Sequence, residues 1–148
     1  PLVLNELAQS GIPVIINPMD NIPNSFDELS SSLELASILN QAGVTIMFDS
    51  ARSHNYHLMR QGAGNAVAYG MKYEDAISGM SKIVADVFGI KNRGSLVKGN
   101  FADVVIWESD PLEPASMPLY VIVEGEQMDL ITRSSRLKDR YINKLIKN

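Results

Sequence analysis

Asp49 is the residue whose position in the sequence most readily suggests a chemical role. Asp49 directly follows Val44–Phe48, a largely apolar run that predicts a strand buried on both faces. The carboxyl end of such a strand opens onto the mouth of an α/β sheet or barrel, where ligands bind. A carboxylate there can bind a metal or take a proton from a metal-bound water. An aspartate at a strand end also starts turns, so position alone leaves both interpretations open.

A second polar cluster follows the preceding apolar run, Ile12–Ile16. If the two runs are parallel neighbours in a sheet, Asn17 and Asp20 share a rim with Asp49 and can contact a substrate there. Asx turns beside the neighbouring prolines explain the same residues, and we favour that interpretation.

The two histidines, His54 and His57, lie with Arg52 in the polar segment behind Asp49. On a helix, histidines three apart are neighbours and can share a metal. Exposed or hydrogen-bonding histidines are the commoner outcome, and this pair cannot complete a three-histidine zinc site. The chain has no cysteine, which excludes disulfides, thiolate zinc sites and cysteine nucleophiles.

Composition and charge restrict the class of protein. The 148 residues include 13 Lys and Arg against 17 Asp and Glu, a formal net charge of −4, and 45% are hydrophobic. This balance is typical of a folded domain and argues against a nucleic acid or an anionic membrane as partner. No stretch reaches the roughly 18 apolar residues of a membrane helix. Because the chain begins at Pro1 without an initiator Met, we expect a processed or truncated start.

Strands and helices alternate in the first part of the chain. Between the two apolar runs, capping-box spacing at Ser25 and Glu28 predicts a helix that ends at Ala42. Strand–helix–strand order with buried strands makes a parallel βαβ unit. The helices expected here are Leu2–Ser10, Ser25–Ala42, His57–Tyr69 and Glu74–Phe88.

The pattern changes after about residue 92. The strands expected in the second part are Ala102–Trp107, Leu119–Val123 and Glu126–Ile131. Glu124-Gly125 is typical of a two-residue hairpin turn between the last two. From Ser134 the tail is amphipathic and predicts a closing helix. We therefore expect βα units over 1–92, and a small antiparallel β unit with a helix over 93–148.

One stretch of the second part resembles a known signature. Gly94–Trp107 followed by Asp110-Pro111-Leu112 reads Gly-Ser-Leu, two residues, Gly, two residues, Ala-Asp, an apolar strand, then Asp-Pro-Leu. This resembles the C-terminal signature of the metal-dependent amidohydrolase superfamily. Asn17–Pro23 is similar to the Asn-Pro-Leu-Asp-Asn-Leu-Pro segment of its imidazolonepropionase-like members. The resemblance covers nearly the whole chain.

The resemblance implies an α/β fold made of the C-terminal βα units of a TIM (β/α)8 barrel and the C-terminal part of a small flanking β-sandwich. In the family, the aspartate that ends the eighth barrel strand binds the metal and activates the hydrolytic water, so Asp49 is expected to be both catalytic residue and metal ligand. The implied cofactor is a divalent metal, with zinc favoured. The implied reaction is hydrolysis of a carbon–nitrogen bond in a small-molecule amide, cyclic or peptide-like. Asn17, Asp20, Arg52 and His54 are the weaker substrate-binding candidates.

Several residues of the family pattern are missing from this chain or replaced in it. The family's His-x-His pair and later histidines would precede Pro1, so the chain is expected to be a C-terminal fragment. One carboxylate cannot hold zinc in a site that needs three or more protein ligands, so the fragment alone is expected to be inactive. The Thr and Asn-Pro-Ala of the penultimate helix are replaced by Ser81 and Ile83-Val84-Ala85, which affects the subgroup but not the superfamily.

Two other hypotheses stay open. A non-catalytic binding or assembly module derived from a truncated barrel would expose sheet edges and apolar faces, and self-association is expected of it. A phosphoacceptor domain with Asp49 as acceptor is disfavoured, because no acidic pair follows Ile12–Ile16 and a β-rich tail does not fit a five-stranded doubly wound sheet.

Overall fold

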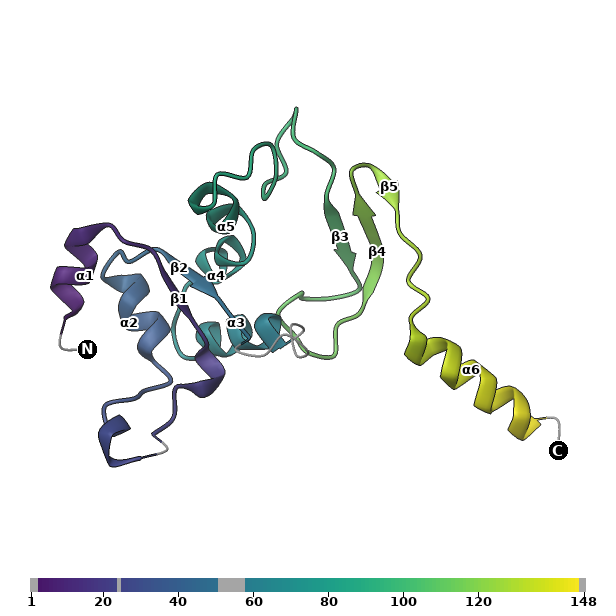
Figure 1. The fold of residues 1–148 in the computed structure, drawn as a ribbon, viewed down its shortest axis with the longest axis horizontal. Helices are drawn as coiled ribbons and strands as arrows, with labels where there is room; N and C mark the ends of the chain where they lie inside the picture. Colours follow the sequence, from purple (N-terminus) through teal and green to yellow (C-terminus); the bar gives the residue numbers. More distant parts are fainter. Residues whose placement is uncertain (1–2, 24, 51–57, 147–148) are drawn as a thin grey trace.

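The computed structural model describes residues 3–23, 25–50 and 58–146. Figure 1 shows a helical body around strands β1 and β2, then the sheet β3–β5, and then helix α6, which extends away from both. The helices are α1 (Leu4–Ser10), α2 (Leu35–Gln41), α3 (Leu58–Ala68), α4 (Tyr73–Gly79), α5 (Lys82–Val87) and α6 (Arg133–Ile146), with short 3-10 turns η1 (Pro18–Asp20) and η2 (Phe26–Glu28). The strands are β1 (Val14–Ile16), β2 (Ile46–Phe48), β3 (Val104–Trp107), β4 (Pro118–Val123) and β5 (Glu126–Gln127).

The first sheet is the parallel pair of β1 and β2, with Ile16 opposite Phe48. All of β2 is buried, whereas Ile15 at the centre of β1 is 56% exposed. The predicted βαβ order is confirmed, because β1, α2 and β2 follow one another and the strands are parallel. The described strands form this two-stranded sheet and a three-stranded one, so the described residues show a mixed α/β fold without a closed barrel.

The hydrophobic core lies where α2, α3 and α4 cover β2. Leu112 joins this core from the connection between β3 and β4, so the second part of the chain is anchored in the first. The buried core residues are Ala36, Leu39, Val44, Ile46, Phe48, Ala63, Ala66, Met71, Ala76 and Leu112.

The predicted start of the helix before β2 is wrong. Ser25 precedes only the short turn η2 and its side chain makes no capping hydrogen bond, while α2 begins at Leu35. Phe26 is 91% exposed, so the expected apolar face is not buried there. Local hydrogen bonds hold this segment as turns instead: Asn21 Nδ2 donates to the carbonyl of Ser32, and Ser32 Oγ accepts from the N–H of Glu34.

The helix predicted over Glu74–Phe88 is divided into α4 and α5, so that prediction is also wrong. The cause is the close approach of α4 to β2, where a Cβ on Gly79 would lie 2.8 Å from the carbonyl oxygen of Ile46. Ser81 then leaves the helical conformation at φ −139°, ψ −88°. A tertiary contact therefore interrupts a segment whose apolar spacing is continuous.

The second sheet is antiparallel in the order β3–β4–β5. Glu124 and Gly125 have φ of 53° and 84°, which confirms the predicted two-residue turn. β5 is shorter than predicted and ends at Gln127. Asp129 Oδ1 accepts from the N–H of Ile131 at 2.8 Å, so a local turn replaces the ladder there.

The predicted closing helix is confirmed as α6, which has no buried residue. Reciprocal hydrogen bonds cap its N-terminus: the N–H of Thr132 donates to Ser135 Oγ at 2.8 Å, and the N–H of Ser135 donates to Thr132 Oγ1 at 3.1 Å. Among the described residues, no helix combines the length and the apolar composition needed to span a membrane.

Candidate functional site

The carboxyl ends of β1 and β2 bring Asn17 and Asp49 to adjacent positions. Ile16 and Phe48 are paired, and the N–H of Asp49 donates to the carbonyl of Ile16 at 2.9 Å. The predicted shared edge is therefore confirmed for these strand ends. We call Asn17, Asp20 and Asp49 the strand-end rim.

Asp49 is exposed, although it follows a fully buried strand. Its Oδ1 accepts from the N–H of Ser50, the residue directly after it, at 2.7 Å, whereas an Asx turn uses the N–H two residues on. A carboxylate has lone pairs on both oxygens, so one such bond leaves acceptor capacity for a cation or a water. Both interpretations from the sequence are compatible with this geometry.

Asn17 and Asp20 form an Asx turn. Asn17 Oδ1 accepts from the N–H of Met19 at 3.1 Å, and Asn17 Nδ2 donates to Asp20 Oδ2 at 2.7 Å. Pro18 occupies the first position of η1, as a capped turn favours. The favoured turn interpretation is confirmed, and the exposed carboxylate of Asp20 remains at the rim.

A pocket of about 290 Å³ opens beside the strand-end rim. It lies between the end of β1, the turn η1 and the start of α2. Its lining combines aliphatic side chains with the amides and carboxylate of the Asx turn. The lining residues are Ile16, Asn17, Pro18, Asp20, Asn21, Leu33, Leu35 and Ala36. Asp49 is not among these lining residues, but its backbone N–H donates to the carbonyl of Ile16, which is one of them.

The remaining candidates, Arg52 and His54, lie outside the described residues, as does His57. Among the residues that the structure describes, no group of three or more His, Cys, Asp or Glu side chains is placed to hold a metal. Asp49 fits one ligand position of a metal site, since it is an exposed carboxylate at a strand end. It cannot complete a site by itself.

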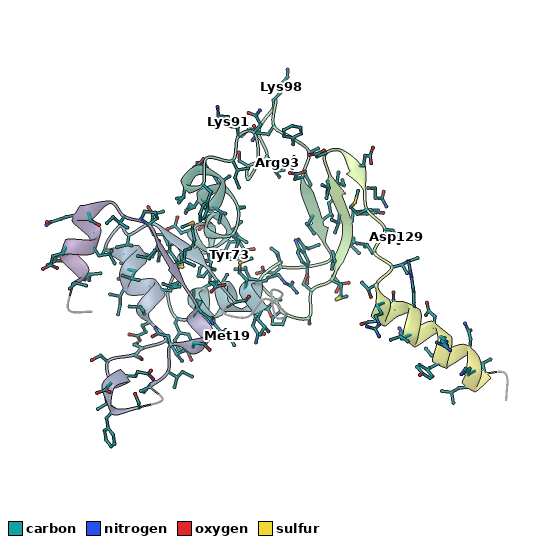
Figure 2. The ribbon with its side chains drawn as sticks, viewed as in Figure 1. Met19, Tyr73, Lys91, Arg93, Lys98 and Asp129 are labelled. Carbon is teal, nitrogen blue, oxygen red and sulfur yellow. The ribbon has the colours of Figure 1, made fainter. Side chains whose placement is uncertain are left out.

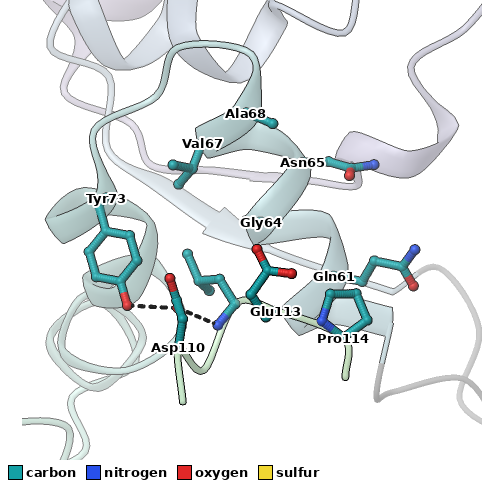
Figure 3. Close-up of a pocket in the computed structure, with 10 residues that line it drawn as sticks. Gln61, Gly64, Asn65, Val67, Ala68, Tyr73, Asp110, Glu113 and Pro114 are labelled. Atoms are coloured by element: carbon teal, nitrogen blue, oxygen red, sulfur yellow. Dashed lines mark hydrogen bonds between the residues drawn. The ribbon is translucent and has the colours of Figure 1, made fainter. Parts of the chain in front are cut away.

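A larger pocket, of about 330 Å³, lies between α3 and the connection from β3 to β4 (Figure 3). There the hydroxyl of Tyr73 donates to Asp110 Oδ1 at 2.9 Å, and the same oxygen accepts from the N–H of Leu112 at 2.8 Å. The pKa of Tyr73 is raised. The largest cause is partial desolvation of the phenol, and the hydrogen bond to Asp110 and the negative charge of Asp110 add to it. The Asp-Pro-Leu aspartate thus fastens the connection to the start of α4.

Arg60 fastens the same connection to α3. Its guanidinium donates to the carbonyl oxygens of Pro111 at 2.8 Å, Glu113 at 3.0 Å, Ser116 at 3.1 Å and Pro114 at 3.3 Å. It also lies 4.5 Å from the centroid of the Trp107 ring. The sequence analysis missed this role and that of Tyr73. The available signal was that Arg60 is the one charged residue within α3.

The Ala-Asp of the signature is likewise structural. Asp103 Oδ1 accepts from the N–H of Glu124 at 2.8 Å, and Arg93 pairs with the carboxylates of both Asp103 and Glu124. The pKa of Asp103 is lowered, mainly by the hydrogen bond from the backbone N–H of Glu124 and to a lesser extent by Arg93. Figure 2 shows Arg93 on the loop between α5 and β3. Asp103 therefore holds the hairpin turn against the start of the sheet.

Comparison with known proteins assigns the class. The model of the Amidohydrolase family matches residues 3–128, so the chain belongs to the amidohydrolase family. This confirms the resemblance at the family level.

Individual relatives agree. The chain is 26% identical over 128 residues to amidohydrolase tasK of Hapsidospora irregularis. The aligned region is 84% of this chain and 13% of that protein. The chain has a TM-score of 0.74 and 24% identity to the crystal structure of an amidohydrolase from Thermotoga maritima MSB8, over 86% of this chain and 34% of that chain. The likeness in structure shows a shared fold, and the chain spans only part of either relative.

Proposed function

We propose that the protein containing this chain is a metal-dependent hydrolase of carbon–nitrogen bonds in small-molecule amides, cyclic or peptide-like. Membership of the amidohydrolase family supports the reaction class. The observation that carries the proposal is the exposed carboxylate of Asp49 at the carboxyl end of the buried parallel strand β2. Active sites of α/β sheets and barrels lie at this end of their strands.

In this proposal β1, α2, β2 and α3 are the last βα units of a TIM barrel. The parallel pairing of β1 and β2 supports this placement, as does the structural likeness to the amidohydrolase from Thermotoga maritima. The sheet β3–β5 is then the C-terminal part of the flanking sandwich. The sequence of Asn17–Pro23, which resembles the segment of the imidazolonepropionase-like members, supports that subgroup.

A divalent metal, with zinc favoured, would polarise the substrate carbonyl and lower the pKa of a bound water to about 7. Asp49 would supply one carboxylate ligand and accept a proton at a carboxylate oxygen. Because a zinc site needs three or more protein ligands, the other ligands would come from the rest of the protein. We therefore propose that the 148-residue chain alone is inactive.

The pocket beside the strand-end rim suits part of a substrate. Its aliphatic walls, Leu33, Leu35 and Ala36 among them, can take an apolar group, while Asp20 can bind a donor at the rim. Arg52 and His54, in the segment after Asp49, are proposed as further substrate contacts. Such a mixture of apolar walls and a few polar groups is typical of small-molecule sites.

The test measures hydrolysis by the complete protein on a panel of dipeptides, N-acyl amino acids and cyclic amides. We expect Asp49→Asn to lower kcat by about 10²–10⁴-fold, the range of a lost general base, with the fold intact. Asp27→Asn is the matched control, because it changes an exposed carboxylate that does not line the pocket and should leave kcat nearly unchanged. Full activity of Asp49→Asn would contradict the proposal. A folded protein that turns over none of the panel would favour the non-catalytic binding module.

A further inference from the structure

Helix α3 holds the turn η1, which carries Asp20. Gly62 lies so close to Pro18, the buried first residue of η1, that a Cβ at Gly62 would be 3.3 Å from Pro18 Cδ. Three residues further along the same face of α3, Asn65 Nδ2 donates to Met19 Sδ at 2.9 Å. The turn is therefore held against α3 at two successive residues, once by packing and once by a hydrogen bond.

The contact at Met19 extends to the carboxylate of Asp20. The backbone N–H of Met19 donates to Asn17 Oδ1 at 3.1 Å, while the side chain of Met19 accepts from Asn65. Asp20 is the next residue, and its N–H donates to the carbonyl of Asn17 at 3.2 Å. Asp20 Oδ2 accepts from Asn17 Nδ2 at 2.7 Å. Because these bonds tie the turn together, a displacement of Met19 must also move Asp20.

The neighbouring residue Gly64 makes a different contact. A Cβ at Gly64 would lie 2.8 Å from the carbonyl oxygen of Leu112, in the connection between β3 and β4. Figure 3 shows the side chain of Asn65 pointing away from Asp110 of that connection. Helix α3 therefore contacts the turn and the connection through different residues, and substitutions can separate the two contacts.

We propose that Gly62 and Asn65 are positioning residues, which fix Asp20 where it binds a protonated amine of the substrate. This inference rests on the proposed function and adds to it a substrate class, aminoacyl amides with a free amino group. A carboxylate accepts hydrogen bonds on both oxygens, so the bond from Asn17 leaves capacity for an ammonium donor. The residues that line the neighbouring pocket include Asp20 but no Lys, Arg or His, so an amine is favoured there over an acidic group.

The first experiment measures hydrolysis of leucyl-alanine and of N-acetyl-leucyl-alanine, which lacks the protonated amine, by the complete protein. Loss of a charged hydrogen bond in Asp20→Asn should raise KM for the free dipeptide by about tenfold or more. Asn65→Leu, which misplaces the same carboxylate, should raise it by about threefold to tenfold. Because the lost interaction is made equally in the ground state and the transition state, kcat should stay nearly constant. KM for the acetylated dipeptide should not change.

Asn40→Leu is the matched control for Asn65→Leu. It removes an amide hydrogen bond of the same kind, from Asn40 Nδ2 to Asp75 Oδ2 at 2.8 Å. Asn40 lies near the end of α2, whereas the pocket beside the rim lies at the start of that helix. We expect this control to leave the ratio of the two KM values unchanged.

The two glycines of α3 give a second comparison, which keeps the inference testable if Asn65→Leu does not fold. Gly62→Ala places a methyl group against Pro18 and should raise the ratio of the KM values. Gly64→Ala overlaps the Leu112 carbonyl and should lower stability more, yet leave the ratio unchanged. A general loss of stability would produce the opposite order.

The last measurement combines Asn65→Leu with Asp20→Asn. Because the effect of Asn65 passes through Asp20, the double variant should have the same KM for the free dipeptide as Asp20→Asn alone. Additive effects, or equal changes in both KM values, would overturn the positioning role. If the protein hydrolyses other amides in an Asp49-dependent manner but neither dipeptide, this inference is wrong and the proposed function stands. Hydrolysis that does not depend on Asp49 would contradict the proposed function and this inference with it.

Discussion

The carboxylates of the signature region and the carboxylate at the end of β2 have opposite surroundings. Asp103 is held by Arg93 and a backbone N–H, and Asp110 by the hydroxyl of Tyr73 and a backbone N–H. Asp49 is exposed, and its Oδ1 accepts from the adjacent backbone N–H of Ser50. The carboxylates that make the family recognisable fix the architecture. The one at the strand end remains open to solvent and to a ligand.

The largest loss of stability should follow substitution of Arg60, which hydrogen-bonds the connection between β3 and β4 in the signature region. Arg60→Ala removes the donor to the carbonyls of Pro111, Glu113 and Ser116 and the stacking on Trp107. Because these carbonyls lose a charged donor, we expect the free energy of unfolding to fall by about 2–4 kcal/mol. Urea unfolding of the complete protein measures it, with Lys98→Ala as the exposed control. A change as small as that of the control would mean that Arg60 does not anchor the connection.

A smaller loss of stability should follow when the close packing of α3 against the same connection is disturbed. A Cβ on Gly64 would lie 2.8 Å from the carbonyl oxygen of Leu112, whereas one on Gly62 would lie 3.3 Å from Pro18 Cδ. We expect Gly64→Ala to destabilise by about 1–3 kcal/mol, because backbone must shift to relieve the overlap. Gly62→Ala is the matched comparison and should cost less, because its nearest neighbour is a proline side-chain atom at 3.3 Å and not a backbone oxygen at 2.8 Å. The gain in helix propensity, about 1 kcal/mol, is common to both substitutions. Thermal unfolding of the two variants decides, and equal effects would contradict the close contact.

A still smaller effect should depend on pH, through Asp103. Its pKa is lowered in the folded state, so the folded protein releases this proton more readily than the unfolded chain. The stabilisation is therefore present above the ordinary pKa of 3.8 and is lost as pH falls through the lower folded value.

Asp103→Asn should accordingly lower the Tm at pH 7, and the difference from the unsubstituted protein should shrink below pH 3.8. Asp139→Asn, on the exposed helix α6, controls for the loss of a surface carboxylate. A difference in Tm that stays constant across this range would show that the pairing of Asp103 with Arg93 and Glu124 does not stabilise the fold.

Both strand ends could be predicted from the sequence, because buried parallel strands leave a local pattern. The apolar runs and the residues just after them were sufficient to place Asn17 and Asp49 on one rim. The division at Gly79–Ser81 could not be predicted, because it results from contact with β2, which is distant in sequence. Arg60 and Tyr73 were missed for the same reason: their partners lie in residues 110–116. The roles of Arg52 and His54 stay predictions.

The most direct test of the central claim is the metal content of the complete protein beside that of Asp49→Ala. Because Asp49 is exposed and β2 pairs through its backbone, the substitution should change stability by less than about 0.5 kcal/mol. We expect near-stoichiometric zinc or a similar divalent metal in the unsubstituted protein, and a marked loss in Asp49→Ala but not in Asp20→Ala. The assignment of Asp49 as a ligand of the catalytic metal would be contradicted if the unsubstituted protein contained no metal. It would also be contradicted if the unsubstituted protein, Asp49→Ala and Asp20→Ala contained equal amounts.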